Sequence, residues 1–501
     1  MSDPVILPRA NHTISRQQID PDALKVLYRL HQNDYAAYLV GGSVRDLLLG
    51  RRPKDFDIGT SAQPYQVKKL FRNCWIIGRR FRLAHVRFGT KNIEVATFRR
   101  LVTAEELAAD EAAQAAARAE AEAARGAAEA IHAESDAEAE GNAATVSAAL
   151  EDAAAAVRDV DALAGVDPRF IPRPANRAAR NRDREREQDL LIQRDNSFGT
   201  PEEDAFRRDF TVNALFYDIA DFSIIDYTGG LQDLEAKIIR SIGDPNERFR
   251  EDPVRMTRAV ALAARLDFTI DALVDDAIAT HRGDIARAAP ARLTEEVYKI
   301  LRNGKAEKTF RMLAERKLLE PIAPELQEAA GPRLWSALAA VDRYRADFEE
   351  TPETLTNAIL MGAIIIPMGF TLQMMSPTFT ADGDRRDPKL SLGMLPLARR
   401  DVEHLRQILT LQKRLMDTTQ GTKARRALAQ RGPFKEALTW LEIFGDAPDV
   451  LESWRSFLED GPEGPLDVVP EAVGGEHRPR KRRRGGRGRR RGPGPGPAPV
   501  V

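Results

Sequence analysis

The first hundred residues alternate between two hydrophobic patterns. Apolar residues that recur every three or four positions form one face of a helix, whereas short apolar runs rich in β-branched residues suit strands. This alternation predicts an α/β or α+β unit. The predicted helices are 21–33, 43–50 and 64–71, and the predicted strands are 35–40, 54–60, 75–78, 84–89 and 92–98.

From about residue 246 the pattern becomes mainly helical. Helical spacing of apolar residues is clear at 251–266, 291–305, 307–319 and 401–416, and it predicts an all-α part after the mixed part. The longest apolar run, 358–370, is shorter than the roughly 20 residues of a membrane span, and a proline interrupts it. We therefore expect a buried helix there and no membrane segment.

Two segments lack the large apolar residues that a packed core needs. Residues 101–160 contain 26 alanines and 14 acidic residues, and an Arg-rich polar stretch follows. Such a segment is either a solvated helix or a disordered acidic insertion, and the Gly-, Pro- and Arg-rich last 40 residues are predicted to be disordered. The predicted organisation is a head at 30–240, an insertion within it at 101–194, a helical neck at 241–310, a helical body at 311–460 and a disordered tail at 461–501.

The formal net charge of −1 conceals opposite local charges. Residues 101–160 carry 14 acids against three arginines, whereas the last 24 positions hold ten basic residues and no acid. We expect this tail to bind RNA phosphates without sequence preference, in a salt-dependent manner, the alternative being a solubilising tail or a contact with another acidic partner. Its basic residues are Arg478, Arg480, Lys481, Arg482, Arg483, Arg484, Arg487, Arg489, Arg490 and Arg491.

The chain has one cysteine, Cys74, which excludes an intramolecular disulfide and a CxxC metal site. We expect Cys74 to be buried and inert. A single thiol is typical of a reducing compartment, and the first residues show no apolar leader after a basic end. Both observations favour a cytoplasmic protein.

The segment LVGGSVRDLLLGRRPKDFD at 39–57 carries the clearest chemistry. Gly41 and Gly42 join a predicted strand to a helix, where bare backbone amides can approach phosphate oxygens, and Arg45 lies one turn further on. Asp55 and Asp57 are two positions apart, which places both carboxylates on one face of the predicted strand and makes a hard oxygen site for Mg²⁺. Each feature alone is usually structural, but their order favours a metal-dependent nucleotide site.

This segment resembles the head-domain signature of the class II tRNA nucleotidyltransferase and bacterial poly(A) polymerase family, within the DNA polymerase beta superfamily. Further blocks match in order: IIGRRFRLAHVRFG at 76–89, IEVATFRR at 93–100, EEDAFRRDFTVNAL at 202–215, DYTGGLQDL at 226–234 and EDPVRMTRA at 251–259. The resemblance covers roughly residues 30–310. It implies a mixed-sheet nucleotidyltransferase head followed by a helical neck and body. The segment 101–194 departs from the family, in which the corresponding connection is much shorter.

The resemblance implies a role for each matched residue. Asp55 and Asp57 match the catalytic pair that binds the metal, and Asp209 matches a third catalytic carboxylate. Glu94 competes for that third role, the alternative being a surface acid paired with an arginine such as Arg99. The implied nucleotide-binding residues are Gly41, Gly42, Arg45, Arg208, Asn213, Asp252, Arg255 and Arg258.

The spacing of Asp252, Arg255 and Arg258 places the three side chains on one helical face. The resemblance implies that this segment reads the incoming base, since an aspartate acceptor and an arginine fork can distinguish base edges. The alternative is a plain salt bridge between residues three apart. His85, which lies between strand residues, is expected to be packed or hydrogen-bonded rather than catalytic.

The active-site blocks alone do not distinguish poly(A) addition from CCA addition. The run at 76–89, the helical text around ILTLQKRLM and the basic tail are similar to those of the bacterial polymerases. We therefore predict a template-independent polymerase that adds AMP from ATP to RNA 3′ ends in RNA processing or decay, with Mg²⁺ or Mn²⁺. The alternatives are a CCA-adding tRNA nucleotidyltransferase and a noncatalytic RNA-binding scaffold. The presence of Asp55, Asp57 and Asp209 argues against the scaffold, which would need none of these carboxylates. RNA-decay proteins could bind the tail or the insertion.

Overall fold

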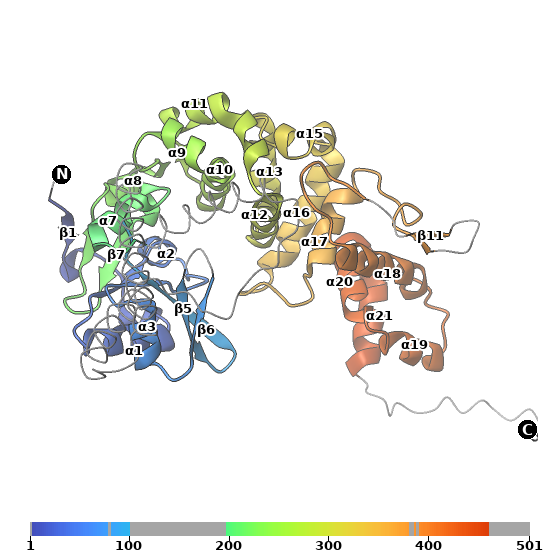
Figure 1. Cartoon of the computed structure of the whole chain (residues 1–501). Helices are drawn as coiled ribbons and strands as arrows, with labels where there is room; N and C mark the ends of the chain where they lie inside the picture. Colours follow the sequence, from blue (N-terminus) through green and yellow to red (C-terminus); the bar gives the residue numbers. More distant parts are fainter. Residues whose placement is uncertain (1–2, 79–81, 101–196, 380–384, 387–389, 460–501) are drawn as a thin grey trace, which may run out of the picture.

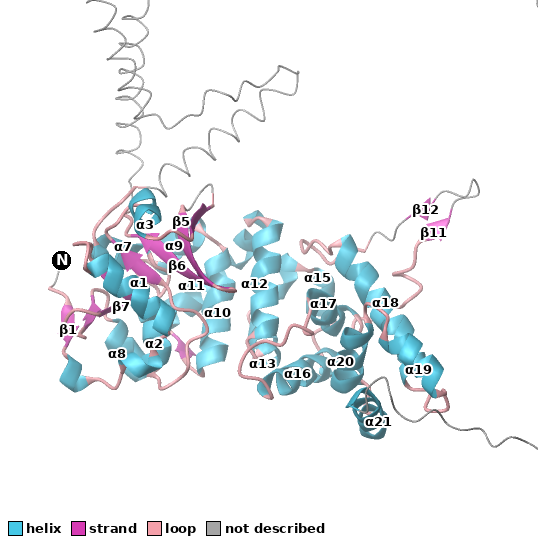
Figure 2. Ribbon diagram, turned by 90° about the horizontal axis from the view of Figure 1, so that it is seen from below, coloured by secondary structure: helices cyan, strands magenta, loops and turns pink. Residues whose placement is uncertain are grey.

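The computed structural model of the chain describes residues 3–78, 82–100, 197–379, 385–386 and 390–459. Figure 1 shows a mixed head at one end, a curved series of helices above it and a helical body at the other end. The view from below in Figure 2 separates the strands of the head from the helices that follow. This arrangement confirms the predicted fold class for the head and the body. The insertion at 101–194 and the basic tail lie outside the described residues.

The head is built on a sheet of eight strands in the order β1-β8-β7-β2-β3-β6-β5-β4. Neighbouring strands are antiparallel except β3 and β6, which are parallel. The strands are β1 (Val5–Leu7), β2 (Ala37–Val40), β3 (Ile58–Thr60), β4 (Cys74–Ile77), β5 (Leu83–Phe88), β6 (Lys91–Thr97), β7 (Leu215–Asp218) and β8 (Ile224–Asp226).

One face of this sheet packs against helices. Alternate residues of β5 and β6, among them Val86 and Val95, are buried in the same core as Leu27 and Val67, as expected from the two-residue period of strands. Cys74 belongs to this core and is 5% exposed, which confirms its predicted burial. In the described part of the head, the helices are α1 (Pro21–His31), α2 (Gly42–Leu48), α3 (Pro64–Leu70), α7 (Pro201–Arg207) and α8 (Gly230–Ala236).

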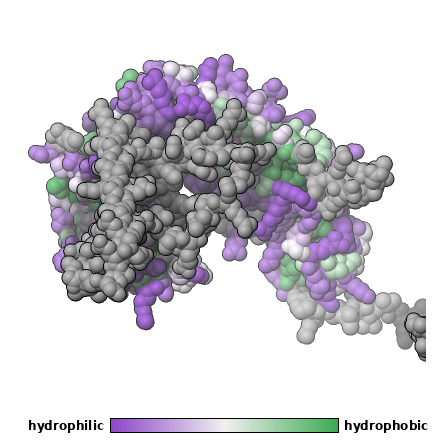
Figure 3. Space-filling view, viewed as in Figure 1, coloured by the Kyte–Doolittle hydropathy of each residue, from purple (hydrophilic) through white to green (hydrophobic). Residues whose placement is uncertain are grey.

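The chain after the head is helical, with two short strand pairs. In Figure 3 the described surface is hydrophilic over most of the visible face, with hydrophobic residues gathered where the neck meets the body. None of the helices in the described part is long and apolar enough to cross a membrane. The longer helices are α9 (Pro245–Glu251), α10 (Val254–Leu266), α11 (Ala272–His281), α12 (Pro290–Arg302), α13 (Ala306–Glu315), α16 (Pro332–Ala346), α17 (Asn357–Ile365), α18 (Arg399–Leu415), α19 (Thr422–Ala429), α20 (Phe434–Phe444) and α21 (Pro448–Glu459).

The structure confirms one predicted helix and shortens one predicted strand. The apolar run at 358–370 contains α17, whose residues 358–365 are all buried, as predicted. The strand predicted at 54–60 is shorter, because β3 begins at Ile58 and both aspartates precede it. The hydrogen bonding between β2 and β3 ends with the Val40 N–H, which donates to the Asp57 carbonyl at 3.0 Å. After Val40 the chain leaves the sheet at the glycine pair.

Candidate active site

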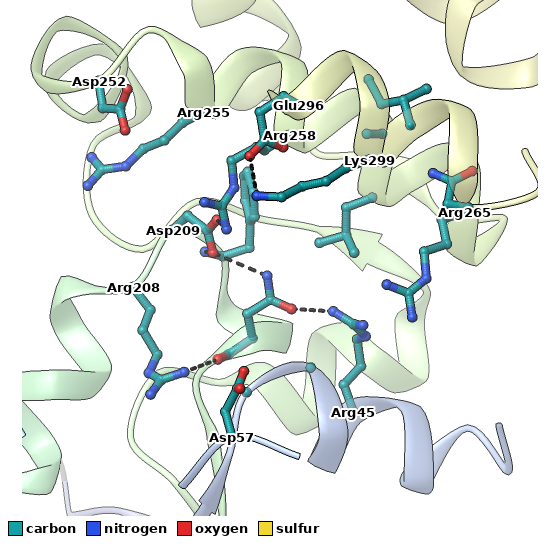
Figure 4. A pocket seen from close by; sticks show the side chains of 18 of the residues that line it. Arg45, Asp57, Arg208, Asp209, Asp252, Arg255, Arg258, Arg265, Glu296 and Lys299 are labelled. Atoms are coloured by element: carbon teal, nitrogen blue, oxygen red, sulfur yellow. Dashed lines mark hydrogen bonds and ion pairs between the residues drawn. The ribbon is translucent and has the colours of Figure 1, made fainter. Parts of the chain in front are cut away.

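A cavity of about 620 Å³ opens between the head and helices α10 and α12 (Figure 4). Ten of the residues that the sequence analysis singled out line it, whereas Asp55 and Glu94 are not among its lining residues. The ten are Gly41, Gly42, Arg45, Asp57, Arg208, Asp209, Asn213, Asp252, Arg255 and Arg258. Segments more than 200 residues apart in the sequence therefore meet at one cavity.

The turn between β2 and α2 requires glycine at Gly41. Its φ is +72° and its ψ is −129°, a backbone conformation that L-residues with side chains rarely adopt. A Cβ atom there would also lie 2.8 Å from Nη1 of Arg208. The missing side chain thus lets the Arg208 guanidinium approach the backbone at the start of α2.

Asn213 lines the cavity and is the centre of a polar network that joins Arg45, Arg208 and Asp209. Its Oδ1 accepts from Arg45 Nη1, its Nδ2 donates to Asp209 Oδ1 at 3.2 Å, and its carbonyl oxygen accepts from Arg208 Nη1 at 3.1 Å. Arg208 is held further by Asp204, with Nη2 3.0 Å from Oδ2. One amide residue therefore orients two arginines toward the space above the glycine turn.

Arg265 is a cavity residue that the sequence analysis missed. Its Nη2 lies 2.5 Å from Oδ2 of Asp46, whose Oδ1 accepts from Arg45 Nε at 2.9 Å. Asp46 and Arg45 are each 3% exposed, and burial lowers the pKa of Arg45 against the opposing effect of Asp46. Arg265 lies seven positions after Arg258, a spacing that returns to the same face of a helix, and this was the available signal.

Asp209 is paired with the neck rather than with Asp57. Arg258 Nη2 lies 2.6 Å from its Oδ2, and Phe210 N–H donates to its Oδ1 at 2.9 Å. Burial alone would raise the pKa of Asp209, but Arg258, Asn213 and the Phe210 amide outweigh it and hold the pKa below its ordinary value. Asp209 is therefore an ionised carboxylate whose charge is compensated.

Glu94 lies beside Asp57. In the parallel pair of β3 and β6, Ile58 is opposite Val95, so the preceding residues are neighbours on the other face of the sheet. Desolvation, then the charges of Glu94 and Asp55, raise the pKa of Asp57 to about 6. The nearest ion-pair partner of Glu94 is His85, whose Nε2 lies 3.7 Å from Glu94 Oε1. The β5–β6 register places His85 opposite Glu94, and the Glu94–Arg99 pair stays a prediction.

These carboxylates fit a hard divalent cation. Burial, followed by the charges of Glu94 and Asp55, raises the pKa of Asp57, and Mg²⁺ prefers carboxylate oxygens. Within the described ranges, however, no group of three or more Asp, Glu, His or Cys residues is arranged to hold a metal ion. Asp55 and Asp57 thus remain the predicted ligands, and Glu94 is the carboxylate nearest to them in register.

Asp252 and Arg255 lie at the far end of the cavity from Arg265 (Figure 4). Asp252 accepts two hydrogen bonds from Arg292, at 3.1 and 2.7 Å, while Arg255 Nη1 lies 3.0 Å from Glu251 Oε2. The alternative of a salt bridge between Asp252 and Arg255 was therefore wrong, since each has another partner. Asp252 also precedes α10 instead of lying on it, because Pro253 is the residue that caps this helix.

Three family models match the chain. They are the poly A polymerase head domain at 37–240, the probable RNA and SrmB-binding site of polymerase A at 267–330 and the polymerase A arginine-rich C-terminus at 391–491. The first match runs close to the predicted head, and the last includes the basic tail. Together the three cover most of the chain.

Individual relatives are of two kinds. The poly(A) polymerase I of Salmonella typhi is 42% identical over 324 residues, which are 64% of this chain and 54% of the relative. The CCA-adding enzyme of Bacillus pumilus is 27% identical over 350 residues, 69% of this chain and 63% of the relative. A solved structure, the Bacillus stearothermophilus CCA-adding enzyme in complex with CTP, is similar at a TM-score of 0.48 and 22% identity, covering 88% of this chain and 83% of that chain. The chain spans about half the length of the polymerase it matches.

Proposed function

The chain belongs to the poly(A) polymerase family, and from that premise we propose that it adds AMP from ATP to RNA 3′ ends without a template. The observation that carries the proposal is the cavity at which the glycine turn, the arginine network and Asp57 meet. Greater identity to a poly(A) polymerase than to a CCA-adding enzyme supports ATP as the repeated substrate. A cytoplasmic location remains part of the proposal.

In the proposed mechanism, one part of the cavity binds the triphosphate and another holds the metal ion. The backbone of Gly41 and Gly42, with Arg45 and Arg208, binds the triphosphate, because amides and guanidinium groups suit phosphate oxygens. Asp55 and Asp57 would hold Mg²⁺, which when bound neutralises charge on the departing pyrophosphate and favours ionisation of the attacking 3′-hydroxyl. The bond from the α-phosphorus to the bridging oxygen breaks as the new phosphodiester bond forms.

The far end of the cavity suits the base. Adenine presents an amino donor and ring-nitrogen acceptors, which complement an aspartate acceptor and an arginine donor fork. Asp252 and Arg255 are already held by Arg292 and Glu251, respectively, so their side chains are oriented before ATP binds. Such preorganisation lowers the entropy that binding would otherwise cost.

One assay separates the proposal from its two alternatives. Purified protein is given Mg²⁺ and either oligo(A) with ATP or tRNA lacking CCA with CTP and ATP. Long tails from ATP alone support a poly(A) polymerase, and growth that stops after CCA on tRNA indicates the CCA-adding alternative. The absence of incorporation on both primers would indicate a noncatalytic RNA-binding scaffold.

We expect Arg265→Ala to raise the KM for ATP about tenfold with little change in kcat. Arg45 and Arg265 share the single carboxylate of Asp46, which leaves one excess positive charge at the phosphate end of the cavity. A hydrogen bond from a charged group contributes about 1.5 kcal/mol or more, equivalent to roughly tenfold in affinity. Steady-state kinetics and the inhibition constant of pyrophosphate measure the effect.

Arg52→Ala is the matched control for this variant. Arg52 also forms an ion pair across the molecule, with Nη1 2.5 Å from Glu349 Oε2, but both side chains are strongly exposed and neither lines the cavity. Its loss should leave both constants unchanged. An Arg265→Ala variant with the ATP and pyrophosphate constants of the wild type would contradict a phosphate-binding role for Arg265.

A further inference from the structure

The outer face of strands β4, β5 and β6 carries exposed apolar and aromatic side chains. Trp75 and Ile77 on the edge strand β4 are 50% and 51% exposed. Leu83 and His85 on β5 are half-buried on the same face, because their neighbours Ala84 and Val86 point into the core. We call Trp75, Ile77, Leu83 and His85 the outer strand face.

Strand register connects this face to the candidate active site. Trp75 is opposite His85, and His85 is opposite Glu94. Glu94 in turn lies beside Asp57, because the residues that follow them, Val95 and Ile58, are opposite each other in the parallel pair of β6 and β3. A row of side chains therefore runs from the exposed edge strand β4 across β5 and β6 to Asp57, directly before β3. With neighbouring strands about 4.8 Å apart, Trp75 stands roughly 14 Å from Asp57.

Reaction geometry indicates what approaches along this row. The attacking oxygen and the leaving pyrophosphate lie roughly in line on opposite sides of the reacting phosphorus. The sheet places β2, with its glycine turn, on one side of β3 and β6 on the other. Because the triphosphate is proposed to bind the β2 side, the RNA 3′-hydroxyl must approach Asp57 from the β6 side. Figure 1 shows β5 and β6 on the side of the head that faces the body.

The chemistry of the face suits single-stranded RNA. Exposed indole rings stack on nucleobases irrespective of sequence, which is what a non-templated tail of changing length requires. Arg87 is exposed two positions after His85 on the same strand and provides a cation for the phosphate backbone. An acidic partner would gain nothing from the indole, and a duplex would not expose its bases to it.

We propose that the outer strand face binds the acceptor RNA a few nucleotides before its 3′ end, with Trp75 stacked on one base. This inference rests on the proposed function, because it assigns the acceptor strand of that same reaction. Trp75 is thus a residue that positions the primer and takes no part in the chemical step. Its loss affects the RNA substrate and leaves ATP binding unchanged.

The test compares Trp75→Ala with Tyr65→Ala. Tyr65 is another exposed aromatic residue, at 61%, on helix α3, which packs against the opposite face of the sheet. We expect Trp75→Ala to raise the KM for an oligo(A) primer about tenfold, the effect of one stacked base. The KM for ATP should not change, Trp75→Phe should retain most primer affinity, and Tyr65→Ala should behave as wild type.

A second measurement needs no catalysis. Titration of the inactive Asp57→Asn variant with oligo(A) should quench tryptophan fluorescence, and the added Trp75→Phe substitution should remove most of the quenching. A wild-type primer KM in Trp75→Ala, or quenching that persists without Trp75, would overturn the inference while leaving the proposed function intact. A wild-type protein that extends no primer would instead overturn the proposed function, and the fluorescence titration would still report on RNA binding.

Discussion

Asp57→Asn is expected to abolish nucleotide addition and, at the same time, to raise the melting temperature of the protein. The carboxylate lines the cavity and is the proposed metal ligand, and charge stabilisation of this kind contributes several kcal/mol to a transition state. We therefore expect kcat to fall by about three orders of magnitude or more. Primer extension with gel analysis of the products measures the loss.

The gain in stability follows from the pKa of Asp57, which the fold raises to about 6 from an ordinary value of 3.8. A carboxyl group whose pKa is higher in the folded state than in the unfolded state costs stability once it ionises. This cost is absent below the ordinary pKa and reaches its full size above about pH 6. Asparagine avoids it, so the difference in melting temperature should be positive at pH 8 and vanish near pH 4.

Asp218→Asn provides the matched control. Asp218 lies on β7, and burial raises its pKa as well, but it does not line the cavity. The control should retain activity.

Mg²⁺ should also raise the melting temperature of the wild type while leaving that of Asp57→Asn unchanged. Activity that survives in Asp57→Asn, or an equal Mg²⁺ response in both proteins, would contradict the proposed metal site.

The residues themselves indicated part of the cavity, the glycine turn with Arg45 and Asp57, whereas the lining residues from the head's 208–213 segment and from the neck were named through the family resemblance. A glycine pair between a strand and a helix, with an arginine one turn later, can be recognised from the local sequence without knowledge of the tertiary structure. Most of the segments with helical or strand periodicity are also helices or strands in the structure. Asp55 and Asp57 were placed inside a strand because alternation does not show where the partner strand turns away.

Local sequence patterns did not show which charged side chains lie next to one another. The neighbours of Glu94 depend on a parallel pairing of β3 with β6 and on the register of β5, and hydrophobic periodicity specifies neither. Arg265 contributes to the cavity because the fold brings α10 of the neck against α2 of the head, where Arg265 pairs with the buried Asp46. A spacing of seven from Arg258 is equally common on an ordinary solvated helix face.

Asp209→Asn is expected to destabilise the protein, which is the opposite of the effect of Asp57→Asn. The fold lowers the pKa of Asp209, so its ionised form contributes stability above the ordinary carboxyl pKa, and this contribution is lost as the pH falls through the folded-state pKa. Arg258 is 44% exposed at its side chain, which reduces the penalty of leaving it unpaired. We expect a loss of about 2 kcal/mol near neutral pH, between the values for surface and buried pairs.

Activity should fall in this variant through positioning. The new amide would present a donor or a weaker acceptor to Asn213, which also holds Arg45 and Arg208. Displacement of such groups by about 1 Å costs roughly 100-fold in rate. In a double-mutant cycle with Arg258→Gln, the two stability losses should be less than additive, because both substitutions remove the same ion pair.

The response to Mg²⁺ then decides between Asp209 and Glu94 as the third carboxylate. If Asp209 serves to hold Arg258 and Asn213, the Asp209→Asn variant keeps the Mg²⁺-dependent rise in melting temperature, whereas Glu94→Gln, next to Asp57, reduces it. We expect this result because the charge of Asp209 is already compensated by Arg258, while Glu94 raises the pKa of Asp57. A Mg²⁺ response that is lost in Asp209→Asn and retained in Glu94→Gln would assign the metal to Asp209 and would require Arg258 to release it when ATP binds.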